Sequence, residues 1–178
     1  RNTLKYYFDV SDTHEGYYNS RPVPIWQMNE QYEQAVIERL SDRFGDLESE
    51  DLGEALMQTA KNAVEDNLPD YLAELKDCTK DSFLEELDEL NVGVRLRDTL
   101  SSSIAYTILS RCGADMELWK DEQGFEYISD FNTMKTLSVV GTATTDMCKP
   151  LLMEIGRTIG AYDRQTVSYT HLRAHETG

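Results

Sequence analysis

The apolar pattern between Thr133 and Arg164 constrains the fold of this chain more than any other stretch. Apolar and small side chains recur there every three or four residues, a spacing that places them on one face of a helix. About 30 helical residues span roughly 45 Å, which is longer than a domain of 178 residues needs. We therefore expect other helices to pack along this one. Its predicted inward face consists of Met134, Leu137, Val140, Thr144, Met147, Leu151, Ile155, Ile159 and Tyr162.

Three glycines and one proline modify this long helix. Gly141, Gly156 and Gly160 lie on or beside the apolar face, where a missing side chain lets another backbone approach closely. Pro150 falls inside the pattern, and proline in a helix interior removes a hydrogen bond and clashes with the preceding turn. The sequence therefore predicts a kink near Met147, or two helices that meet there, and an end near Arg164.

Three shorter helices are predicted in the first half of the chain. Asn29 is expected to cap a helix that runs to about Phe44, with Gly45 past its end. Ser49 is expected to cap a second helix, and Pro69 suits the first turn of a third. The inward faces are predicted to be Tyr32, Val36, Leu40 and Phe44 in the first, Leu52, Ala55, Leu56, Ala60, Ala63 and Val64 in the second, and Tyr71, Leu72 and Leu75 in the third.

Two more helices and two aromatic turns follow. A fourth helix is expected from Asp77 or Thr79, and residues 91–93 then break the pattern. A fifth runs from about Val94 to Cys112 and should be the most buried, because its middle is small and apolar. The predicted inward residues and anchors are Phe83, Leu84, Leu87 and Leu90 in the fourth helix, and Trp119, Phe125, Tyr127 and Phe131 in the turns. Gly113 ends the fifth helix, and Asn132 or Thr133 caps the long one.

The N-terminal stretch from Leu4 to Val10 is aromatic and β-prone, so it is predicted to be a strand. A single strand is not stable alone, and no second strand is predicted, so we expect its partners in an upstream domain. The expected fold is mostly α, an irregular bundle of about six to eight helices with one orphan N-terminal β-strand. Residues 1–25 are expected to form the end strand and linker of that upstream domain, and residues 26–166 are expected to form the helical domain.

Charge and composition narrow the possible functions. The formal net charge is −16, which disfavours phosphate backbones and favours basic partners. Residues 42–89 contribute 16 acidic and 4 basic side chains, a net charge of −12. No apolar run is long enough to predict a membrane span. The three separated cysteines, Cys78, Cys112 and Cys148, indicate a reducing and therefore cytoplasmic compartment, and are expected to be buried or half-buried.

No catalytic, cofactor-binding or metal-binding residue is predicted. The pairs that come nearest to such chemistry are His171 with His175, four residues apart, and His14 with Glu15 in a polar loop. Neither belongs to a recognised metal or catalytic pattern. A solvated acidic surface is predicted for Glu85, Glu86, Asp88 and Glu89, and Arg95 and Arg97 are expected to pair with these acids.

Several segments resemble one region of a known family. They are "LKYYFDVSDT", "RPVPIWQMNEQYEQAVIERLSDRFG", "DSFLEELDELNVGVRLRDTLSSSIAYTILSRCG" and "FEYISDFNTMKTLSVVGTATTDM". They are similar to part of very large proteins from conjugative and integrative elements of gut Firmicutes. The resemblance covers Leu4 to Arg164, and Pro150 departs from the family pattern. Residues 167–178, "VSYTHLRAHETG", instead resemble a translated sequencing adapter and are expected to be a non-native tail.

The resemblance implies a place within a DNA-processing protein. In that family an ArdC-like antirestriction domain precedes this region, and helicase and adenine-specific DNA methylase parts follow it. The chain is therefore expected to be a non-catalytic helical connector that contacts neighbouring domains or a protein partner. Nucleic acid would be contacted only through the parent protein. We then expect Tyr6, Phe8 and Trp26 to be under-buried where the upstream domain docks.

Two alternatives remain open. The acidic segment 42–89 could make the chain a DNA mimic that inhibits a restriction or defence nuclease, which requires carboxylates arrayed along one exposed face. An enzyme with an unrecognised site is the other alternative, and it requires a pocket that gathers His14 or the acids with perturbed pKa values.

Overall fold

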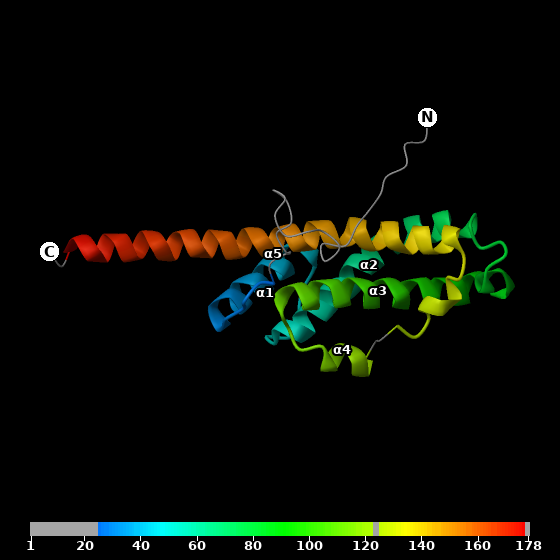
Figure 1. Cartoon of the computed structure of the whole chain (residues 1–178), viewed down its shortest axis with the longest axis horizontal. Coiled ribbons are helices and arrows are strands. Elements are labelled where there is room, and N and C mark those ends of the chain that lie inside the picture. Colours follow the sequence, from blue (N-terminus) through cyan, green and yellow to red (C-terminus); the bar gives the residue numbers. More distant parts are fainter. Residues whose placement is uncertain (1–24, 123–124, 177–178) are drawn as a thin grey trace, which may run out of the picture.

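The structure is a computed structural model that describes residues 25–122 and 125–176. This part of the chain is mostly helical and contains no strand (Figure 1). The predicted strand Leu4–Val10 lies outside the described residues. The elements are α1 (Glu30–Phe44), α2 (Leu52–Lys76), the 3-10 turn η2 (Phe83–Glu86), α3 (Glu89–Cys112), α4 (Glu117–Glu122), the 3-10 turn η3 (Ile128–Asp130) and α5 (Met134–Glu176).

The structure has fewer helices than expected because two predicted boundaries do not interrupt the chain. Pro69 lies inside α2 rather than at the start of a separate helix. Its ring is on the exposed side, where the lost hydrogen bond leaves a carbonyl that water can satisfy. The predicted break at residues 91–93 lies in the first turns of α3, which begins earlier because Asp88 caps it by accepting from the Asn91 amide at 2.9 Å.

The prediction of a fourth helix is wrong in the length of the helix and, in part, in the residues assigned to its inward face. Only the 3-10 turn η2 forms there. Leu84 is buried, as expected, but Phe83 is 53% exposed and Leu90 is 77% exposed. The burial of these side chains differs because the backbone of Leu87 is extended between η2 and the start of α3. A single helical face therefore does not continue from η2 into α3.

The caps at the other helix ends are local and largely agree with the sequence. Asn29 caps α1 by accepting from the Gln31 and Tyr32 amides, both at 3.1 Å. The N-cap of α2 is Asp51 rather than Ser49; Asp51 accepts from the Glu54 amide at 3.0 Å. The hydroxyl of Ser49 supports this cap from outside by accepting from the Asp51 amide.

The helix α3 is the central element, as its small apolar middle predicts. Its buried side chains include polar Thr99, Ser101 and Ser102, which let α2 and α5 pack closely on either side. Gly113 ends the helix with a φ of 65°, a left-handed conformation that glycine adopts without strain. The fully buried aliphatic side chains of α3 are Leu96, Leu100, Ile104 and Ile108.

The long helix α5 is continuous across Pro150, so the expected pair of helices that meet near Met147 does not form. The ribbon of α5 also shows no sharp bend, so the expected kink is not seen (Figure 1). Thr133 begins the helix through a reciprocal cap: its hydroxyl accepts from the Thr136 amide, and the Thr136 hydroxyl accepts from the Thr133 amide, both at 3.2 Å. The helical backbone continues to Glu176, beyond the end expected near Arg164.

The inward face of α5 is confirmed from Val140 to Ile155 and wrong in its first turn. Met134 is 84% exposed and Leu137 is 44% exposed. The reciprocal cap turns Thr136 into the core, which rotates these two side chains outward. The residues of α5 that are buried are Thr136, Val139, Val140, Ala143, Met147, Cys148, Leu151, Glu154 and Ile155.

The helices pack around one core, with α3 and α5 beginning at the same end of the molecule (Figure 1). The helix α1 is joined to α5 by a buried carboxylate. Glu154 is 4% exposed, and it lies 2.7 Å from Arg39 on α1 and 2.9 Å from Arg157 on its own helix. Hydrogen bonds from Arg39 hold the pKa of Glu154 below its ordinary value.

The exposed proline in α5 makes a direct stability prediction. Pro150→Ala should raise the free energy of unfolding by about 1–3 kcal/mol, because alanine restores the hydrogen bond to the Asp146 carbonyl. Part of this gain is offset, because alanine leaves the unfolded chain with more conformational freedom than proline does. Urea unfolding measures the change. Lys149→Ala, at the neighbouring exposed position, is the control and should change stability by no more than about 0.5 kcal/mol. A destabilised Pro150→Ala variant would show that the ring makes packing contacts instead.

The ion pairs of Glu154 predict a dependence on pH. Because the folded state lowers its pKa, the stabilisation is present above the unfolded pKa of about 4.3 and is lost as the pH falls through the folded value. Glu154→Gln should therefore be less stable than the natural sequence at pH 7, with a difference that shrinks on acidification. Thermal unfolding between neutral and acidic pH measures this. Glu86→Gln removes an exposed carboxylate and should leave the pH profile nearly unchanged; equal profiles for both variants would contradict the assignment.

Candidate functional site

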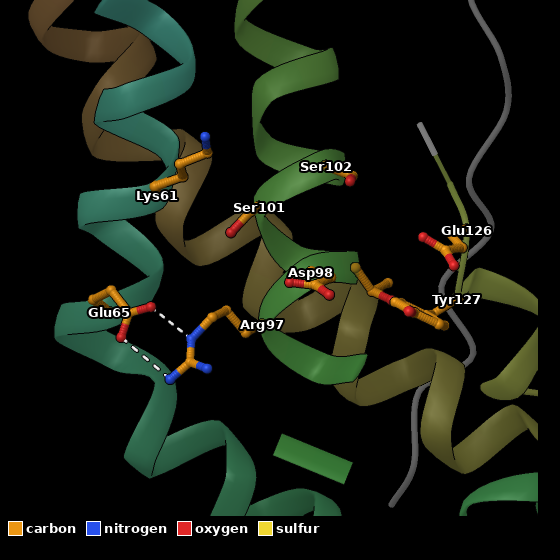
Figure 2. Close-up of a pocket in the computed structure, with 9 residues that line it drawn as sticks. Lys61, Glu65, Arg97, Asp98, Ser101, Ser102, Glu126 and Tyr127 are labelled. Atoms are coloured by element: carbon orange, nitrogen blue, oxygen red, sulfur yellow. Dashed lines mark hydrogen bonds and ion pairs between the residues drawn. The ribbon is translucent and has the colours of Figure 1, made fainter. Parts of the chain in front are cut away.

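A polar cavity lies between α2, α3 and the segment before η3 (Figure 2). Its volume is about 330 Å³, within the lower range for small-molecule sites. The helix α2 contributes Lys61 and Glu65, and the other side chains come from α3 and from the chain that precedes η3. The lining residues are Lys61, Glu65, Arg97, Asp98, Thr99, Ser101, Ser102, Glu126 and Tyr127.

The charges in this cavity mostly satisfy one another. Arg97 pairs with Glu65 across the cavity at 2.6 Å (Figure 2). Burial raises the pKa of Asp98; the positive charge of Arg97 partly offsets this effect, and the neighbouring Glu126 adds to it. A hydrogen bond with Glu126 raises the pKa of Tyr127. The cavity therefore holds one carboxylate, Asp98, whose pKa is raised, but the described hydrogen bonds do not couple a serine hydroxyl to it.

A second hollow, the Trp26 groove, lies between α3 and α5 and has Trp26 among its lining residues. Its volume is about 570 Å³. The Trp26 amide donates to the Arg111 carbonyl at 3.0 Å, and the Arg111 guanidinium lies 4.2 Å from the centroid of the indole ring. The lining residues are Trp26, Thr107, Arg111, Thr144, Thr145, Cys148, Lys149, Leu152 and Met153.

The position of Trp26 depends on one of the predicted glycines. A Cβ added to Gly156 would lie 3.2 Å from the Trp26 ring, so the missing side chain lets the indole lie directly on α5. The expected approach of a second backbone is therefore not found at Gly156, where an indole ring approaches instead. A Cβ on Gly141 would meet nothing within 4 Å. Trp26 itself is half-buried and packs on the core, whereas Tyr6 and Phe8 lie outside the described residues.

The predicted polar clusters have structural roles where they are described. The acids of the 85–89 segment are exposed; Asp88 caps α3, and Glu89 pairs with Lys76 at 2.6 Å. Arg95 and Arg97 do pair with acids, but not with that segment. Arg95 lies 2.7 Å from Asp130 and stacks on the Tyr127 ring. This is because α3 begins earlier than expected, and its additional first turn directs Arg95 toward η3.

The histidine pairs lie outside what the structure describes. His14 and Glu15 precede the described residues, and the side chains of His171 and His175 on α5 are not described. Among the described residues, no three metal-ligating side chains gather in one place. Within the same ranges, no helix combines the length and the apolar character that crossing a membrane requires.

The cysteines are free; Cys112 and Cys148 are buried and Cys78 is half-buried, which confirms the expected burial. Burial raises the pKa of Cys112 to about 12 and that of Cys148 to about 11. At pH 8 only about one Cys148 in a thousand is then a thiolate, the form that reacts.

These thiols predict a two-step reaction with Ellman's reagent. At pH 8 the folded protein should react quickly at Cys78 alone, and all three cysteines should react after unfolding in guanidinium. The released thionitrobenzoate measures both steps. Cys78→Ser should abolish the fast step; a fast step that survives this substitution would show that a buried thiol is accessible.

Sequence reasoning missed the residues that shape the Trp26 groove. No role was assigned from the sequence to Arg111 or to Lys149. The one signal was the glycine at position 156, which indicated a close contact without naming Trp26 as the partner. In comparisons with known proteins, no protein family, no characterised protein and no solved structure matches this chain.

Proposed function

We propose that the chain is a non-catalytic helical connector and interaction module of a large mobile-element protein that processes DNA, of the antirestriction, helicase and methylase type. The sequence resemblance supports the parent class. The observation that supports an interaction role is a group of exposed apolar side chains at one end of the bundle, here named the apolar end: Phe83, Leu90, Met134 and Leu137.

The apolar end joins the beginnings of two helices. Phe83 comes from η2, Leu90 from the first turn of α3, and the other two residues from the first turn of α5. The Phe83 amide donates to the Asn132 side chain at 3.0 Å, which ties η2 to the segment that caps α5. Large apolar side chains that stay exposed in one region are typical of a surface that docks another protein or domain.

Acidic side chains adjoin the apolar end. Asp81, Glu85, Glu86 and Asp88 are all exposed and lie within the same short stretch as Phe83 and Leu90. Such a surface favours a partner whose apolar side chains are flanked by lysine or arginine, and charge attraction would speed its association. This fits a neighbouring domain or a protein partner better than it fits nucleic acid.

Serine substitutions test the docking role. Leu90→Ser, Met134→Ser and Leu137→Ser together should lower the stability of this chain by less than about 1–2 kcal/mol, because these side chains are largely exposed. In the parent protein the same substitutions should abolish the association of this module with its neighbour, measured by limited proteolysis of the parent. Met153→Ser, 44% exposed elsewhere on α5, is the control. An unchanged proteolytic pattern would contradict docking at the apolar end.

A second test separates this module from the DNA-binding part of the parent. The chain should not bind a single-stranded oligonucleotide at physiological salt, measured by fluorescence anisotropy. Micromolar binding that weakens steeply with salt, the sign of contacts to phosphates, would show that this chain is itself the DNA-binding part.

The DNA-mimic alternative has one specific observation in its favour. Asp66, Asp70 and Glu74 are exposed on α2 at four-residue intervals, which place carboxylates about 6 Å apart along the helix. Glu65 lies beside this row on α2 but pairs with Arg97, and most of the other acids of residues 42–89 lie around the α1–α2 connection or at the apolar end, so the row is short. A mimic should compete with DNA for a restriction nuclease, and Asp66→Asn with Asp70→Asn should abolish that competition while leaving the apolar-end tests unaffected.

A further inference from the structure

We propose that the Trp26 groove binds an amphipathic organic anion, a carboxylate carried on an apolar body. The proposal is independent of the docking role of the apolar end. It depends on the charges, orphaned polar atoms and apolar side chains that line this one hollow between α3 and α5.

The groove carries positive charge in a strongly acidic chain. Its two titratable cations are Arg111 and Lys149, and no carboxylate is among its lining residues. Within the described part of the chain, neither cation forms an ion pair; Arg111 instead stacks on Trp26. The polar cavity of Figure 2 differs, because its arginine is neutralised by Glu65. Two cations left without carboxylates in a chain of net charge −16 indicate that this groove suits an anion.

Two residues of the groove each carry a buried polar atom that lacks a hydrogen-bond partner. Nη1 of Arg111 and Oγ1 of Thr144 are both buried without a partner, and both residues line the groove. A buried donor without an acceptor costs free energy, more so when it belongs to a charged group. A bound carboxylate near the guanidinium would supply acceptor oxygens, and a small side-chain movement would bring them within reach.

Most of the remaining lining is apolar, apart from Thr107 and Thr145. Trp26, Leu152 and Met153 form walls that a charged group alone would not fill, and Met153 is 44% exposed. A volume of about 570 Å³ accommodates a medium-length acyl chain or an aryl group. The ligand class that satisfies both parts is therefore a monocarboxylate with an apolar chain, its headgroup at Arg111 and Lys149 and its body along α5.

Octanoate and its uncharged counterpart octanamide test the proposal with the full chain. Trp119→Phe removes the other of the two tryptophans, so the fluorescence of Trp26 alone reports binding. In this background octanoate should saturate with a Kd below about 1 mM, and octanamide should bind at least about tenfold more weakly. Calorimetry on the natural sequence checks that Trp119→Phe does not change the Kd for octanoate.

Variants locate the binding. Lys149→Gln should raise the Kd for octanoate about tenfold, and Arg111→Gln should do the same if it remains folded. Lys135→Gln, an exposed lysine on the same helix but outside the groove, is the matched control and should not change the Kd. Equal binding of octanoate and octanamide, no saturable binding, or equal effects of Lys149→Gln and Lys135→Gln would each overturn the proposal.

Discussion

Phe131→Ala is expected to lower the free energy of unfolding by about 3–5 kcal/mol, because truncating a fully buried phenylalanine loses its burial and leaves a cavity. Phe131 is 0% exposed and is the largest side chain buried to that degree. It comes directly after η3, so the loss should also loosen the segment that leads into α5. Urea unfolding at constant pH measures the change.

A second phenylalanine provides the control for this prediction. Phe125 is 42% exposed and contacts the rings of Tyr106 and Trp119. Phe125→Ala should cost only about 1–2 kcal/mol, from the lost ring contacts and partial burial. Similar losses for the two variants would show that Phe131 does not fill the core as described.

Leu100→Ala should cost about 2–5 kcal/mol, since Leu100 is fully buried in the middle of α3 between α2 and α5. Leu90→Ala makes the same chemical change on the same helix, where the side chain is 77% exposed. It should alter stability by no more than about 0.5 kcal/mol. The difference between the two variants, measured by thermal and urea unfolding, tests whether α3 is the centre of the bundle. Equal effects would contradict this arrangement.

Local signals predicted the parts of the fold that depend on local chemistry. The Asn29 cap, the stop at Gly113 and the start of α5 at Thr133 each depend on one side chain and the next few residues. These are interactions that a sequence displays directly. The small, apolar middle of α3 predicted its burial, and the regular helical period of α5 predicted the burial of its middle.

The errors came where packing outweighed a local signal. Pro69 and Pro150 indicated boundaries, yet both lie within helices whose buried faces continue on either side of them. Helical stability in proteins comes mainly from packing of such a face, so one lost hydrogen bond on the exposed side does not end the helix. The outward turn of Met134 and Leu137 had a related cause, since the cap at Thr133 set the register of the first turn.

The candidate sites were harder to predict than the fold. The Trp26 groove is formed by residues from three separate segments. Its positive charge arises because its described lining residues include two cations and no acidic side chain. A sequence with 33 acidic side chains gives no indication that, within the described residues, neither Arg111 nor Lys149 forms an ion pair with a carboxylate. The partners of Arg95 and Arg97 were misassigned for the same reason, because the nearest acids in sequence are not the nearest in space.

The two helix prolines have a consequence for how the bundle opens. Without an amide hydrogen, Pro69 and Pro150 leave the carbonyls of Glu65 and Asp146 without their helical donors. The helices α2 and α5 then each consist of two hydrogen-bonded ladders that meet at an exposed gap. Amide exchange with deuterium should therefore show α2 and α5 opening in halves, with faster exchange in the turn around each proline than in α3, whose ladder has no such gap.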